Sequence, residues 1–277
     1  MFSITYKNTL KSLFRTFSFW LLLFVVLVVS VHGALSGFYG YDDDPEFVLT
    51  YQSYIQCIIN SCAAKMLMYA LPIFVVFATV FILNRDYGDK FFEIEKAANV
   101  RSLAYLSGRL AAFATVAFVT LFVMNMLCLH LYVFTRGGVE GMQIGEYLLD
   151  SFIRVIRVDL IVGMPSLIFY IGITYLLGTV FKNGLPAAII SVGHIIGFYV
   201  FNFIFSARLA KEYFDYFSPV PNKLRFYFHY YDTEWFEMML NRTKTTLNDA
   251  VFCICFLVGI TAVCYLVSLF RIKKRDI

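Results

Sequence analysis

Charged residues are scarce in this chain. Asp, Glu, Lys and Arg make up 15% of its 277 residues, whereas ordinary soluble domains contain about 25%. Hydrophobic residues make up 60%, and the mean hydropathy is +0.72. A soluble core of this size could not absorb so much apolar surface, so the excess is expected to face lipid. The composition therefore predicts an all-α membrane protein.

Sequence motifs that bind nucleotides or activate nucleophiles are missing as well. The chain has no G-x-x-x-x-G-K-[ST], and no Gly is followed directly by Lys, although ATP hydrolysis needs that Lys on a phosphate-binding loop. Neither H-E-x-x-H nor G-x-S-x-G occurs, and the four His residues are isolated from one another. We expect no catalytic residue, no metal and no cofactor in this chain itself.

Basic residues form no stripe outside the membrane flanks, and the net charge is only +4, so no nucleic-acid partner is expected. Two of the six Cys residues, Cys57 and Cys62, lie in a segment that we expect to be external. They are either a disulfide or two ordinary thiols, and the sequence leaves both open. The other four lie inside apolar runs and are interpreted as small core residues: Cys128, Cys253, Cys255 and Cys264.

Six apolar runs are long enough to cross a bilayer, which takes about 20 residues per helix. We therefore predict one transmembrane domain over residues 1–277, with spans at about 17–38, 66–83, 103–134, 158–181, 185–206 and 250–270. The first run is too long for a signal peptide and lacks a clean cleavage site, so it is taken as a retained span. Only residues 182–184 separate the fourth and fifth spans, which predicts a tight hairpin.

The distribution of Lys and Arg predicts the orientation, because cytoplasmic loops are enriched in these residues. With both termini in the cytoplasm, 13 of the 23 basic residues lie on the inner side, and the others are spread over longer external loops. The long segment 207–249 is expected to be external, and its many aromatic side chains suit the lipid headgroup layer. Residues 2–16 carry Lys7, Lys11 and Arg15 on one helical face, which favours an amphipathic helix at the cytoplasmic interface.

The loop between spans two and three starts at Arg85 and alternates charged with apolar residues. Phe91, Phe92 and Ile94 can form one apolar face, while Glu93 and Lys96 remain in water. This pattern predicts a short amphipathic helix, which either lies on the lipid surface or docks in a groove of another protein.

At this loop the chain resembles the permease subunits of ABC type-2 exporters. The matching features are an acidic/basic pair, a Gly, a short amphipathic coupling helix, a small-Pro-x-x-Arg-type turn and a Gly-Lys-like entry into span three. They are found here at Arg85-Asp86, Gly88, Phe91 to Ala97, Arg101-Ser102 and Gly108-Arg109. Ala98 stands where Pro is frequent, and Arg109 replaces the usual Lys. The resemblance extends over nearly the whole chain, from the basic N-terminal helix to the C-terminal Phe270-Arg271-Ile272-Lys273-Lys274-Arg275-Asp276.

The resemblance implies a function and partners. Two permease chains, identical or different, would line the substrate pathway of an exporter in a bacterial cytoplasmic membrane. Two separate ATPase subunits would bind ATP and Mg²⁺ and receive the coupling residues: Arg85, Asp86, Gly88, Phe91, Phe92, Glu93, Ile94, Lys96 and Arg101. The substrate is not indicated. Alternative interpretations are a non-transporting sensor or immunity protein that binds a peptide or lipid, and a membrane-embedded processing enzyme.

Three polar residues inside the predicted spans are candidates for the pathway: Asn125, Asp159 and Asn202. Ionisable groups at membrane depth are functional candidates by default. Asp159, however, is expected near the external end of span four, where a structural ion pair with Arg157 or Arg154 costs little. Gly193 and Gly197 form a G-x-x-x-G in span five, which suits either a dimer interface or packing within the chain.

Overall fold

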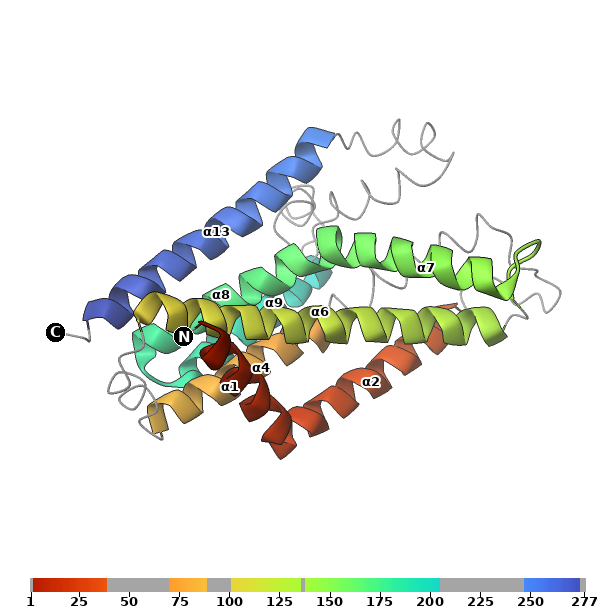
Figure 1. Cartoon of the computed structure of the whole chain (residues 1–277). Coiled ribbons are helices and arrows are strands. Elements are labelled where there is room, and N and C mark those ends of the chain that lie inside the picture. Colours follow the sequence, from red (N-terminus) through yellow and green to blue (C-terminus); the bar gives the residue numbers. More distant parts are fainter. Residues whose placement is uncertain (1, 39–69, 89–100, 136–137, 205–246, 275–277) are drawn as a thin grey trace.

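The computed structural model describes residues 2–38, 70–88, 101–135, 138–204 and 247–274, and this part of the chain is almost entirely helical (Figure 1). The helices are α1 (Phe2–Arg15), α2 (Phe17–Phe38), α4 (Ala70–Gly88), α6 (Ser102–Thr135), α7 (Ile144–Val158), α8 (Met164–Phe181), α9 (Gly184–Ile204) and α13 (Leu247–Lys274). The loop helix expected around Phe91, the external segment 207–249, and Cys57 with Cys62 lie outside the described residues.

Helix length and apolarity support a membrane-embedded bundle. In the described part of the chain, four helical segments are long and apolar enough to cross a membrane: Ala70–Gly88, Ser102–Leu131, Ile144–Phe181 and Val251–Lys273. A fifth is added if α1 and the start of α2 are one bent span, and α9 contributes a shorter apolar helix. Among the described residues the structure thus has four or five such helices, whereas the sequence predicts six spans over the whole chain.

The corner between α1 and α2 bends the chain by 73° at Thr16. Local hydrogen bonds fix this corner. The Thr16 hydroxyl donates to the carbonyl oxygen of Ser12 at 2.9 Å, and the indole Nε1 of Trp20 donates to the carbonyl oxygen of Phe14 at 2.7 Å. These bonds satisfy carbonyl groups at the C-terminal end of α1, which have no partner within the helix. Before the corner, α1 lies across the bundle and packs on α6 (Figure 1).

Between spans three and four the sequence suggested only a connecting segment, but the structure has a helix there. The amphipathic α7 continues through a π-helical turn, η2 (Asp159–Gly163), into α8. Pro165 follows this turn at the start of α8, and its missing N–H interrupts the α-helical hydrogen-bond ladder. The result is a nearly continuous helical segment from Ile144 to Phe181, 38 residues long.

The hairpin expected at residues 182–184 is present. Helix α8 ends at Phe181, Lys182 adopts a left-handed conformation (φ 56°), and α9 begins at Gly184. The Asn183 side chain accepts a hydrogen bond from the Leu185 amide at 2.9 Å and so caps α9. The Gly184 amide donates to Asn84 Oδ1 of α4, also at 2.9 Å, which ties the turn to the end of α4.

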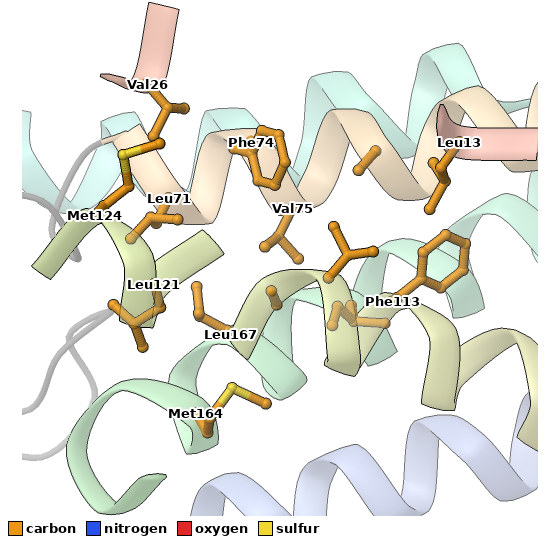
Figure 2. Packing of buried hydrophobic residues seen from close by; sticks show 14 of the residues in the cluster. Leu13, Val26, Leu71, Phe74, Val75, Phe113, Leu121, Met124, Met164 and Leu167 are labelled. Atoms are coloured by element: carbon orange, nitrogen blue, oxygen red, sulfur yellow. The ribbon is translucent and has the colours of Figure 1, made fainter. Parts of the chain in front are cut away.

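The core lies where α4, α6 and α8 meet, and α1, α2 and α13 add side chains to it. Figure 2 shows Phe74 and Val75 of α4, Phe113 and Leu121 of α6, and Leu167 of α8 converging on one apolar cluster. Small residues allow close approach at two contacts of α8. A Cβ added at Gly172 would meet Thr261 of α13 at 3.1 Å, and one at Gly178 would meet Leu83 of α4 at 2.5 Å. These contacts set the spacing of α8 from its neighbours.

One end of the bundle gathers segments that are far apart in the sequence. The end of α4, the start of α6, the α8–α9 turn and the C-terminal end of α13 lie together there, near the N-terminal helix (Figure 1). Three of the four Cys residues expected in the core, Cys128, Cys253 and Cys264, are buried. Cys255 is exposed, contrary to expectation, because α13 packs on the bundle along one face only and Cys255 lies on the other.

Candidate functional site

A buried polar cluster joins α1, α4 and α6 at this end of the bundle. Its centre is Asp86 of α4, which is 2% exposed. Asp86 Oδ1 accepts from Arg109 Nη2 at 2.6 Å, and its Oδ2 accepts from the Tyr105 hydroxyl at 2.6 Å. The guanidinium of Arg109 also lies over the Tyr105 ring, 5.1 Å from its centroid. We call these three residues the Asp86 clamp.

The Asp86 clamp joins the end of α4 to the start of α6. These two ends flank residues 89–100, where the coupling helix is predicted. Asp86 comes three residues before residue 89, and Tyr105 and Arg109 lie in the first turns of α6, after residue 100. A buried ion pair between charged hydrogen-bonding groups is rigid, because separating the charges would leave both uncompensated. The two helix ends that flank residues 89–100 are therefore joined to each other within the bundle.

The same cluster holds the N-terminal helix. Arg109 Nη1 donates to Thr9 Oγ1 at 3.0 Å, and the guanidinium of Arg85 donates to the Ser12 hydroxyl. On α1 the buried residues are Thr5, Thr9, Ser12 and Leu13, so the face that contacts protein is not the basic face of Lys7, Lys11 and Arg15 noted in the sequence. Small hydroxyl residues beside Leu13 were the signal that could have revealed this contact.

Glycine at position 108 permits the close approach of α1 to α6. A Cβ added there would meet the Phe2 carbonyl oxygen and the Thr5 Cβ, both at 3.0 Å. Further along α6 from Gly108, the Tyr6 hydroxyl of α1 donates to Thr115 Oγ1 at 3.2 Å. The Gly108-Arg109 pair noted in the sequence thus has two structural roles, because the Gly makes room for α1 and the Arg bonds to it.

The other predicted coupling residues are placed as follows. Arg101 is exposed at the start of α6, and Gly88 ends α4 with no neighbour within 4 Å of an added Cβ among the described residues. The remaining five lie outside the described residues: Phe91, Phe92, Glu93, Ile94 and Lys96. Because Asp86 is buried in the clamp, its side chain is not on the surface that a partner would contact.

Two of the three predicted intramembrane residues meet each other. Asn125 of α6 and Asp159 of η2 are both completely buried, and Asn125 Nδ2 donates to Asp159 Oδ1 at 2.6 Å. The expected pairing of Asp159 with Arg154 or Arg157 is wrong. Arg154 is bonded to Asp150 at 2.8 Å one turn earlier on α7, and Arg157 is exposed. The third residue, Asn202, lies near the C-terminal end of α9.

Within the described residues no group of three or more His, Cys, Asp and Glu side chains is placed to hold a metal ion. His130 Nδ1 pairs with the Met126 carbonyl oxygen at 2.6 Å, and His194 pairs with the Tyr170 hydroxyl at 3.3 Å.

The fold and the two polar clusters define a helical membrane-embedded protein with two buried aspartates between its helices. No protein-family model matches the chain, and a search of curated proteins gives no significant match.

Proposed function

We propose that this chain is the permease subunit of an ATP-driven exporter of the ABC type-2 kind. It would act in a six-span form, as a dimer with a second permease chain, and with separate ATPase subunits that bind ATP and Mg²⁺. The observation that carries the proposal is the Asp86 clamp, because it anchors both ends of the loop that the resemblance assigns to ATPase coupling.

The clamp gives a route for mechanical coupling. A partner that grips the loop 89–100 would pull on α4 through Asp86 and on α6 through Arg109. Thr9 and Ser12 would carry the same displacement to α1. A loop without such anchors would absorb the movement. ATP-driven closure of the partner subunits could then bias the bundle between two arrangements, as a ligand biases a two-state element.

The positions of the basic residues support cytoplasmic termini. Lys7, Arg101, Lys182 and Arg271 are exposed and lie in segments that gather at the clamp end of the bundle (Figure 1). The positive-inside rule assigns such an end to the cytoplasm, where an ATPase would be. In the six-span form α2 and α9 each cross the membrane as separate spans, in addition to the four long helical segments.

Helix α9 supports the dimer. An added Cβ at Gly193 or Gly197 would have no neighbour within 4 Å among the described residues, so their G-x-x-x-G does not serve packing within that part of the chain. Ile189 and Ile196 are also exposed there, at 63% and 51%. Two copies of α9 could approach closely along this small-residue face.

The experiment is co-purification of the chain with a candidate ATPase subunit, followed by reconstitution into liposomes. Replacing Phe91, Phe92 and Ile94 together by Glu should abolish complex formation and permease-stimulated ATP hydrolysis. The matched control introduces three Glu residues at Ile144, Leu149 and Phe152, which are exposed apolar residues of α7. This control should leave assembly intact. Retained assembly and ATP-driven transport in the loop variant would contradict the coupling role.

A further inference from the structure

The contact between Asn125 and Asp159 leaves one oxygen on each side chain without a partner. Neither Asn125 Oδ1 nor Asp159 Oδ2 has a hydrogen-bond partner among the described residues, although both atoms are buried. Both atoms are acceptors when Asp159 is ionised, so they cannot bond to one another. A buried acceptor without a donor is costly, and a buried ionised carboxylate far more so.

The charged groups of the neighbouring elements do not neutralise Asp159. On α7, Arg154 is bonded to Asp150, while Glu146 and Arg157 are exposed. Helix α8 contains no Asp, Glu, Lys, Arg or His. On α6, His130 bonds to its own helix, and Arg109 is held in the Asp86 clamp sixteen residues before Asn125.

The position along the bundle places this site toward the far boundary of the hydrocarbon layer, and burial among packed side chains keeps it from water. Sixteen residues of α-helix span about 24 Å, and the hydrocarbon layer is about 30 Å thick. With the clamp at one boundary, Asn125 and Asp159 lie within the opposite half of the layer. Met124 precedes Asn125 and Met164 follows Asp159 by five residues, and both side chains belong to the buried apolar cluster (Figure 2).

We propose that Asp159 and Asn125 form a proton-binding site inside the bundle. A proton taken from water forms the Oδ2–H bond of Asp159, and this hydroxyl donates to Asn125 Oδ1. Together with the existing bond from Asn125 Nδ2 to Asp159 Oδ1, it closes an acid–amide pair with two parallel hydrogen bonds. One proton thereby gives a partner to both oxygens and removes the buried charge. Asp159 carries the proton, and Asn125 is its positioning residue.

The π-helical turn is an independent sign that this position is specialised. Wide turns of this kind inside helices are rare and often mark functional sites. Here Asp159 is the first residue of the turn, at the junction of α7 and α8. Loss of the proton would place a carboxylate in this apolar contact and favour separation of α6 from η2, with entry of water. The site thus links proton binding to the packing of α6 against the α7–α8 junction, and it does not depend on ATPase coupling.

The test compares the infrared spectra of the unmodified full chain and of its variants, each in phosphatidylcholine nanodiscs at neutral pH, as difference spectra. The C=O stretch of a protonated carboxylic acid is expected in the unmodified protein and should be lost completely in Asp159→Asn. This substitution keeps the shape of the side chain, and the amide can still bond to Asn125. The matched control is Asp150→Asn in the same helical segment. It removes a carboxylate that is paired with Arg154, and it should leave the band unchanged.

Two further measurements distinguish a bound proton from a bound metal cation and test the role of Asn125. In Asn125→Leu the band of Asp159 should shift, because its hydrogen-bond partner is gone, and an unshifted band would overturn the acid–amide pair. Exchange of Na⁺ or K⁺ for N-methylglucamine should have no effect. A band that vanishes when Na⁺ or K⁺ is added would indicate a metal-cation site and overturn the proposal, as would the absence of any Asp159 band at neutral pH.

Discussion

At the residue scale, two buried aspartates differ in what surrounds them. Asp86 receives a guanidinium and a phenol hydroxyl, so both its oxygens have donors and its charge has a counter-charge. Asp159 receives one neutral amide. Because the same side chain meets such different partners, the first position suits a permanent ion pair that holds helices together, and the second suits a group whose charge can change.

The Asp86 clamp should behave as a coupled unit in a double-mutant cycle. Asp86→Leu or Arg109→Leu alone should each destabilise the protein by about 3–5 kcal/mol, since each leaves an uncompensated buried charge. The double variant should be less destabilised than the sum of the two. The stability of the unmodified protein, the two single variants and the double variant is measured by thermal unfolding of the purified chains in detergent.

The control for that cycle is the partly exposed pair of Asp150 and Arg154 on α7. Because this pair is partly in contact with water and lies within one helical turn, Asp150→Leu should change stability less than Asp86→Leu. Additive effects of the two clamp substitutions would show that Asp86 and Arg109 do not act through their ion pair.

At the element scale, α1 is held by close approach and hydroxyl bonds as well as by the buried Leu13. Thr5, Thr9 and Ser12 contact α6 or α4, whereas Ile4 and Phe14 are exposed, at 62% and 47%. Lys7 and Lys11 are exposed as well. The helix therefore has a face for the bundle, while its exposed apolar and basic groups suit the lipid surface.

Gly108→Ala should weaken this docking. The added methyl group would overlap the backbone of α1 at Phe2, and forced overpacking costs about 1–3 kcal/mol. Hydrogen–deuterium exchange should then show faster exchange of the amides of α1, with α8 unchanged. The matched control is Gly259→Ala in α13, where an added Cβ meets nothing within 4 Å among the described residues. Equal protection of α1 in both variants would contradict the role of Gly108.

At the scale of the whole molecule, two helical segments are longer than a bilayer requires. The 34 residues of α6 span about 51 Å, against about 30 Å of hydrocarbon. The 38-residue segment Ile144–Phe181 is longer still. Both must extend beyond the hydrocarbon layer, and α7 lies beside the far end of α6 (Figure 1). The molecule thus has a basic end, which carries the clamp, and an opposite end formed by α6 and α7.

Cysteine labelling should report these two ends on opposite sides of the membrane. In a background without the native cysteines, Lys7→Cys, Lys182→Cys and Arg271→Cys should react with an impermeant maleimide only after the membrane is permeabilised. Glu140→Cys and Ile144→Cys, both exposed at the opposite end, should react in intact cells. Labelling of all five positions from one side would exclude the proposed orientation.

The apolar runs and turn residues alone determined where most helices lie. Helix α2 covers residues 17–38 and α6 covers 102–135, close to the expected runs, and the hairpin falls at residues 182–184. These features depend on local chemistry, because each segment must satisfy its own backbone in lipid and because short polar turns interrupt helices. Helix α7 was missed, since its mixture of charged and apolar residues also suits an external loop.

Only the tertiary structure decided which polar groups meet. Asp159 bonds to Asn125 rather than to Arg154 or Arg157, because packing of α6 against η2 turns the carboxylate into the bundle. The ion pair of Asp86 with Arg109 joins residues 23 apart, and Arg109 reaches Thr9 across 100 residues. Such pairings depend on the rotation and spacing of whole helices. Close contacts at Gly108, Gly172 and Gly178 set that spacing, and no single segment encodes it.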